Sequence, residues 1–68
     1  MDYYVIKNKR TGRLVSGTNF NTSPLRQRFA SETRPPLLLP ADPLIVELEL
    51  RRRGITYRDY KIVTVRIP

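Results

Sequence analysis

Lysine and arginine are the residues of this sequence whose type and number could do chemistry, and that chemistry is the binding of anions. The chain holds 13 Lys and Arg residues against six Asp and Glu, which gives a formal net charge of +7 over 68 residues. Ammonium and guanidinium groups neutralise phosphates, and a surplus of this size concentrates polyanions near the surface. We therefore expect a nucleic acid (DNA or RNA), or an acidic surface of another protein, as the partner.

The basic residues gather in two clusters along the sequence. The candidate nucleic-acid-binding residues are Arg51, Arg52, Arg53, Arg58 and Lys61 in one cluster and Lys7, Lys9, Arg10 and Arg13 in the other. Each cluster also has a purely structural interpretation. Residues 51–53 could complement a helix dipole and pair with Glu47 and Glu49, and charged turns keep small domains in solution.

Catalysis and metal binding are not expected. The sequence contains no His and no Cys, so it lacks the commonest general base, the commonest metal ligand and the best nucleophile. Glu47 and Glu49 lie two residues apart and would diverge on a helix. The three glycines, at positions 12, 17 and 54, form no phosphate-binding motif. We expect a non-catalytic protein without a cofactor.

The length of the chain limits it to one domain spanning residues 1–68. A chain of this size buries only about 60% of its unfolded surface, so a second copy that buries more would help, and a homo-oligomer is one option. No apolar run approaches the roughly 20 residues that cross a bilayer, and the first residues lack the apolar stretch of a secretory signal. We expect a cytoplasmic protein with no membrane partner.

Segments rich in β-forming residues lie near both ends of the chain. Residues 3–7 lead into the turn sequence Asn8–Gly12, where Gly12 suits positive φ, and residues 13–16 return, which predicts a hairpin over 3–16. Residues 60–67 predict a further strand, paired with the first.

An aromatic and basic face of this sheet is a further candidate. The face is expected to join Tyr3, Val5 and Lys7 with Tyr60, Ile62, Thr64 and Arg66. Such a face could stack bases, as some RNA-binding sheets do. Alternatively, it is a second small core under Leu37 to Leu39.

Residues 18–43 predict an irregular, proline-rich loop, because proline cannot donate within a ladder or helix. Ser23 and Pro24 could start a short helical turn over residues 25–30. Phe29 is a candidate anchor to the core, and residues 37–39 are expected to tether the end of the loop. The loop also carries a looser basic group, which comprises Arg26, Arg28 and Arg34.

Residues 43–53 predict a helix, although residues 46–51 alternate as a strand would. The flanking signals favour the helix: Asp42 is a good N-cap, Pro43 suits the first position and Gly54 suits the residue after the end. The face expected in the core comprises Leu44, Ile45, Leu48 and Ile55. The result is an α+β fold in a ββαβ order: an antiparallel hairpin plus a C-terminal strand, with one helix packed on the sheet.

Four segments carry a resemblance to a known group of proteins. Residues 3–13, 15–18, 52–55 and 60–63 resemble parts of small uncharacterised proteins encoded by phages and prophages of Gram-positive bacteria. The resemblance implies an accessory gene product that binds nucleic acid or a host protein. We favour a nucleic-acid-binding module that contacts phosphates mainly through the cluster after residue 50. The alternative is a phage-type inhibitor or adaptor that binds an acidic surface of a host protein.

Overall fold

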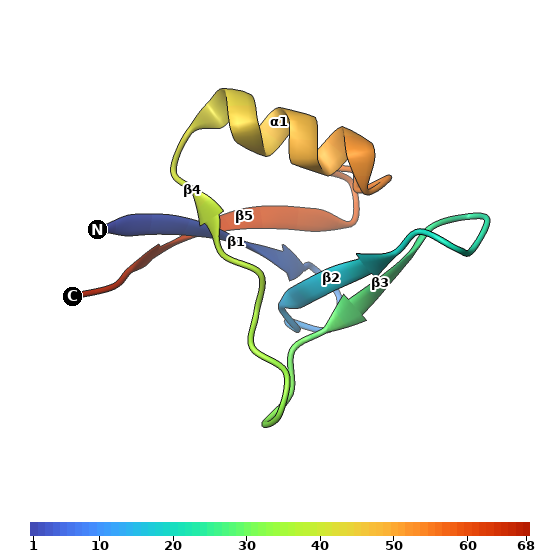
Figure 1. Cartoon of the computed structure of the whole chain (residues 1–68), viewed down its shortest axis with the longest axis horizontal. Coiled ribbons are helices and arrows are strands. Elements are labelled where there is room, and N and C mark those ends of the chain that lie inside the picture. The colour runs from blue at the N-terminus through green and yellow to red at the C-terminus, as the bar shows by residue number, and fades with distance from the viewer.

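Strand β1 (Asp2–Asn8) is the central strand of the larger of two sheets. In this computed structural model, which describes all residues 1–68, β1 pairs antiparallel with β4 (Leu39–Pro40) on one side and with β5 (Tyr60–Arg66) on the other. The smaller sheet contains β2 (Val15–Asn19) and β3 (Arg26–Phe29). The helix α1 (Pro43–Arg52) covers one face of the larger sheet (Figure 1). The fold is a small α+β fold, which confirms the predicted class.

The register between β1 and β5 confirms that the first and last strands pair, but it corrects the predicted faces. The pairs on the side of α1 are Tyr4–Thr64, Ile6–Ile62 and Asn8–Tyr60, and the pairs on the opposite side are Tyr3–Val65, Val5–Val63 and Lys7–Lys61. Direct partners in an antiparallel pair point to the same face. The predicted base-stacking face therefore does not form. Its β1 residues point away from α1, whereas its β5 residues lie on the side of α1: Tyr60, Ile62, Thr64 and Arg66.

The predicted turn forms, but the predicted hairpin ends after a single bridge. Gly12 adopts a φ of +74°, and the amide of Asn8 donates to the carbonyl oxygen of Arg13 over 2.9 Å. Beyond the isolated Lys7–Leu14 bridge the chain leaves β1, and β2 pairs with β3 instead. The backbone groups of β2 must find partners, and β3 supplies them.

The segment 18–43 is therefore less irregular than predicted. β2 continues to Asn19, and both β3 and the short β4 lie inside the segment, so the order is ββββαβ rather than ββαβ. The predicted helical turn over residues 25–30 is wrong, because residues 26–29 are extended and paired with β2. Most of the predicted anchors are confirmed: Phe29 and Leu37 pack against the core and Leu39 is buried in it, whereas Leu38 is exposed.

The helix and its first residue are confirmed, although the helix ends at Arg52 and residue 53 is its C-cap. Its predicted buried face is wrong except for Ile55, which lies in the core. The Asp42 carboxylate accepts a hydrogen bond from the Leu44 amide over 3.0 Å, and Gly54 follows the helix with a φ of +65°. The buried residues of α1 are Val46 and Leu50, each 3% exposed, whereas Leu48 is 68% exposed. Only two residues connect β4 to α1, so the pairing of β4 with β1 restricts which side of the helix can face the sheet.

The core lies between α1 and the two sheets. Six buried side chains form it, from β1, β2, β4, α1 and the segment after α1: Ile6, Val15, Leu39, Val46, Leu50 and Ile55. Because Val15 belongs to β2, this cluster also holds the smaller sheet against the larger one. The one helix has neither the length nor the apolar character needed to cross a membrane.

The orientation of α1 predicts that two chemically identical truncations lower the free energy of unfolding by different amounts. Leu50→Ala should lower the free energy of unfolding by about 2–5 kcal/mol, because it leaves a cavity in the core. Leu48→Ala should change it by less than about 0.5 kcal/mol, because the side chain is exposed. Urea denaturation of both variants at low protein concentration measures the difference. Equal costs would contradict the orientation of the helix.

Candidate nucleic-acid interface

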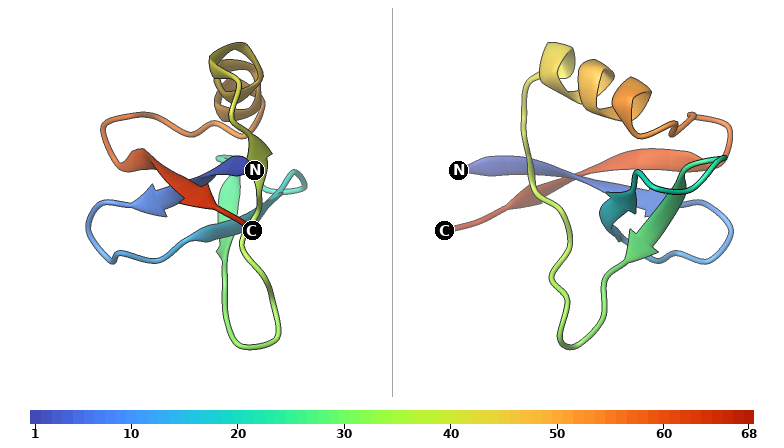
Figure 2. Two further views of the ribbon diagram at one scale, coloured as in Figure 1. Left: turned by 90° about the vertical axis from the view of Figure 1, so that its left-hand side faces the viewer. Right: turned by 45° about the vertical axis from the view of Figure 1, so that its right-hand side comes forward.

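Two segments far apart in the sequence meet at one end of the larger sheet. The turn after β1 lies beside the loop before β5 (Figure 2). The Lys9 amide donates to the carbonyl oxygen of Asp59 over 2.9 Å, and the Lys9 ammonium donates to the carbonyl oxygen of Tyr57. Between the segments lies an open pocket of about 480 Å³, lined by Asn8, Lys9, Arg10, Arg58, Asp59 and Tyr60. The fold thus brings members of both predicted basic clusters together.

A pair of lysines adds further positive charge beside this pocket, on the face of the sheet away from α1. Lys7 and Lys61 are direct cross-strand partners, and neither forms an ion pair. Like charges directly opposite each other destabilise a sheet. The pair raises the local positive potential at a cost to the fold, which is the arrangement expected where an anion is to be bound.

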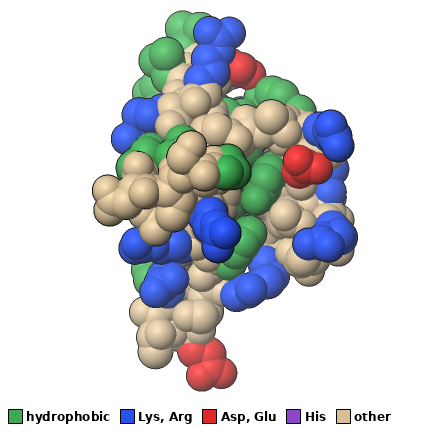
Figure 3. Space-filling view, turned by 90° about the vertical axis from the view of Figure 1, so that its right-hand side faces the viewer, with side chains coloured by type: hydrophobic (Ala, Val, Ile, Leu, Met, Phe, Trp, Pro, Cys, Tyr) green, Lys and Arg blue, Asp and Glu red, His purple; other side chains and the backbone are tan.

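Arg13 completes this end of the molecule. Its guanidinium lies 5.2 Å from the centre of the Phe29 ring, a cation–π contact that leaves its charge without an acidic partner. We call the group Lys7, Lys9, Arg10, Arg13, Arg58 and Lys61 the basic end. The whole chain contains three ion pairs, and none of them involves a residue of the basic end. Basic side chains dominate the surface on the side where α1 ends (Figure 3).

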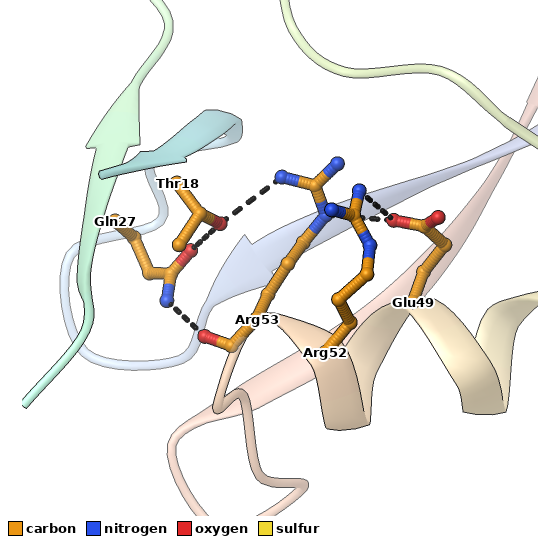
Figure 4. Close-up of polar contacts among 5 residues, drawn as sticks. All are labelled: Thr18, Gln27, Glu49, Arg52 and Arg53. Atoms are coloured by element: carbon orange, nitrogen blue, oxygen red, sulfur yellow. Dashed lines mark hydrogen bonds and ion pairs between the residues drawn. The ribbon is translucent and has the colours of Figure 1, made fainter. Parts of the chain in front are cut away.

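Arg53, the last residue of the predicted arginine cluster, is buried inside the molecule. It is 8% exposed, and its guanidinium donates to the Glu49 carboxylate over 2.9 Å and to the Thr18 hydroxyl over 3.1 Å (Figure 4). The Thr18 hydroxyl donates in turn to the side-chain oxygen of Gln27, whose amide nitrogen donates to the Arg53 carbonyl oxygen over 2.7 Å. This closed network joins α1 to β2 and β3, so the charge of Arg53 serves the fold.

Arg52 and Arg51 are exposed, unlike the buried Arg53, and only Arg52 of these two forms an ion pair. Arg52 pairs with Glu49 over 3.2 Å, and its guanidinium lies 5.0 Å from the centre of the Phe20 ring. Arg51 is exposed and forms no ion pair, so the predicted pair with Glu47 is absent, whereas the predicted pair of Glu49 with Arg53 is present. None of the three arginines lines the pocket of the basic end.

Two pKa values are shifted around the carboxylates of α1: that of Glu49 itself, and that of Tyr57, which contacts Glu47. Desolvation alone would raise the pKa of Glu49, but hydrogen bonds and charge from Arg53 and Arg52 outweigh it and hold that pKa below 4.5. Glu47 instead accepts a hydrogen bond from the Tyr57 hydroxyl over 2.7 Å. That hydrogen bond is the main reason why the pKa of Tyr57 is raised, and desolvation adds to it.

Sequence reasoning missed two residues that line the pocket, Asn8 and Asp59, and it placed a third, Tyr60, on a base-stacking face of the sheet rather than at the turn. Asn8 carried a signal, because the Asn–x–x–x–Gly spacing is typical of a turn whose side chain caps its own backbone. Its side-chain oxygen accepts hydrogen bonds from the amides of Arg10 and Thr11 over 2.9 and 3.0 Å. Asp59 carried no signal, because the predicted pairing of the terminal strands leaves their register open, and it is the register that brings Asp59 and Tyr60 to the turn.

Comparison with known proteins adds no assignment to this geometry. No protein-family model, no curated protein and no solved structure matches the chain.

The network around Arg53 predicts that Arg53 and Arg51 contribute very differently to the free energy of unfolding. Arg53→Ala should lower the free energy of unfolding by roughly 2–4 kcal/mol, because Glu49 and Thr18 lose a charged donor inside the fold. Arg51→Ala removes the same side chain from an exposed position and should cost less than about 0.5 kcal/mol. Thermal or urea denaturation compares them. If Arg53→Ala proved as stable as Arg51→Ala, the network would not be a structural tie.

The lowered pKa of Glu49 predicts a specific loss of stability in acid. Because the folded-state pKa lies below 4.5, the ionised carboxylate contributes its full stabilisation above pH 4.5 and loses it as the pH falls through the folded-state value. Glu49→Gln should therefore be less stable near neutral pH and show a flatter pH dependence below 4.5. Urea midpoints measured across this range test it, with Glu32→Gln as the control for the loss of an exposed, unpaired carboxylate. A wild-type pH profile in Glu49→Gln would contradict the assignment.

Proposed function

We propose that this protein is a small non-catalytic module that binds nucleic acid through phosphate contacts at its basic end. One observation carries the proposal: six cations from two distant segments converge without an acidic ion-pair partner, and Lys7 and Lys61 sit directly opposite each other. A phosphate backbone approaching this end would relieve the repulsion between the two lysines. A phage-type accessory role in the cytoplasm is the setting that we favour.

Contacts of this kind position a nucleic acid without identifying its sequence. Phosphates are the same at every nucleotide, and base recognition requires side chains that reach base edges or stack on bases. The basic end offers mainly long flexible cations, while Tyr60 is partly buried against the core. We therefore infer broad binding with little sequence preference and a strong dependence on salt.

The proposed contact surface differs from the one that sequence reasoning favoured. Arg52 and Arg53 are held by Glu49, so we assign them to the fold rather than to the ligand. Arg58 and Lys61 remain in the proposed contact surface. The turn that carries Lys9 and Arg10, which sequence reasoning treated as a secondary contact, becomes part of the main one.

Asp59 supports a second candidate, an inhibitor or adaptor that docks on an acidic surface of a host protein. This carboxylate lines the same pocket as Arg10 and Arg58. It would repel a phosphate, but it could accept hydrogen bonds from the donors that an acidic protein surface also carries. The two candidates share the basic end and differ in whether the anion is a nucleic acid.

A pair of triple variants with equal net charge tests the location of the site. Lys9→Gln/Arg10→Gln/Arg58→Gln should weaken binding to labelled DNA or RNA at least about tenfold and flatten the slope of log affinity against log salt by about 2–3. Arg26→Gln/Arg28→Gln/Arg34→Gln removes the same charge from exposed positions outside the basic end and should have a much smaller effect. Fluorescence anisotropy over a salt series measures both.

The outcomes separate the candidates. Absence of binding by the wild type to DNA and RNA at low salt contradicts the nucleic-acid proposal, and equal losses in the two triple variants contradict the assignment to the basic end. Pull-down from a bacterial lysate with and without nuclease then decides between partners. A stoichiometric protein that stays bound after nuclease treatment, and is lost with the Lys9/Arg10/Arg58 variant, favours the inhibitor or adaptor.

A further inference from the structure

The outer side of α1 carries an apolar stripe that nothing in the chain covers. Leu44 is 76% exposed and Leu48 is 68% exposed, and with Glu47 and Arg51 they line one shallow surface hollow. These four residues have the i, i+3, i+4, i+7 spacing of a single helix face. No other element lies over this side of the helix in any of the ribbon views (Figures 1 and 2).

The charge around this stripe is balanced, unlike the charge of the rest of the molecule. Residues 42–53 contain three acidic and three basic side chains, so the other ten basic and three acidic residues hold the entire net charge of +7. A polyanion is therefore drawn to the other surfaces. A second copy of this strongly basic chain is repelled less at the neutral helix than at the basic end.

The stripe is also complementary to itself. Glu47 and Arg51 lie one turn apart beside the leucines but form no ion pair with each other, and the Glu47 carboxylate accepts a hydrogen bond from the Tyr57 hydroxyl. In an antiparallel pairing about a two-fold axis, the same flank of both helices meets. Leucine then packs on leucine, and Glu47 of one copy lies within reach of Arg51 of the partner subunit.

We propose that two copies of this chain associate through α1, antiparallel, with Leu44 and Leu48 at the centre and two reciprocal Glu47–Arg51 pairs beside them. The antiparallel direction follows from the position of the basic end, which lies toward the end of the molecule where α1 stops. Antiparallel helices point the two basic ends away from each other, whereas parallel helices would bring them together. A chain with only eight of 68 residues buried gains core from such a partner.

Sedimentation equilibrium of the wild type from about 10 μM to about 1 mM tests the association, because a single helix face predicts a weak dimer. Leu44→Gln/Leu48→Gln keeps the net charge and should raise the dimer dissociation constant at least about tenfold while the circular dichroism spectrum stays that of the folded chain. A wild type that remains monomeric throughout overturns the proposal. So does a dimer unaffected by the leucine variant, as one formed through the open edge of β5 would be.

Charge exchange tests the geometry even if the leucine variant fails to fold. Glu47→Arg and Arg51→Glu should each dimerise at least about tenfold more weakly than the wild type, because each places like charges on the shared flank. When the two variants are mixed they should associate with each other, since every reciprocal pair is then of opposite charge. The double variant Glu47→Arg/Arg51→Glu, with the original net charge, should dimerise as the wild type does. Failure of the mixture and of the double variant to associate overturns the antiparallel arrangement.

Discussion

The buried guanidinium of Arg53 is the polar interaction that fixes α1 against the smaller sheet. Only one isolated bridge, Lys7–Leu14, joins the backbone of β1 to the residue before β2, so side chains must hold the smaller sheet in place: Val15 in the shared core and Arg53 beside it. The Arg53 guanidinium donates to Glu49 on α1 and to Thr18 on β2, and the Arg53 carbonyl oxygen accepts a hydrogen bond from Gln27 on β3. A charge held this way is satisfied and shielded, which removes it from any role at the surface.

The remaining charge is segregated, and the segregation defines two surfaces with different chemistry. The helix and its caps are neutral as a unit, and their outer side is apolar. The basic end, where the turn after β1 meets the loop before β5, is positively charged, and its cations include the directly opposed Lys7 and Lys61. One surface therefore suits a second copy of the same neutral helix face and the other an anion, so that association through α1 and binding at the basic end need not compete.

Much of the secondary structure could be predicted from short local sequence patterns, such as the residues that begin and end a helix or form a turn. Asp42, Pro43 and Gly54 mark the limits of α1 because a helix end needs a side-chain acceptor at one terminus and a positive φ beyond the other. The turn after β1 forms for the same local reason. The strand β3 was not predictable in this way, since its four residues carry no strong strand pattern and become extended only by pairing with β2.

The sequence by itself determined the class of fold, the helix and its limits, the pairing of the two terminal strands and the large positive charge. Only the tertiary structure decided which side of α1 is buried and which arginines remain free. Both depend on partners remote in the chain. The guanidinium of Arg53 donates to Thr18, 35 residues away, and Arg58 lies with Arg10 in one pocket because the register of β5 on β1 places the loop before β5 against the turn after β1. A count of basic residues cannot tell a cation that holds the fold together from one that is left for a ligand, because that difference is made by packing.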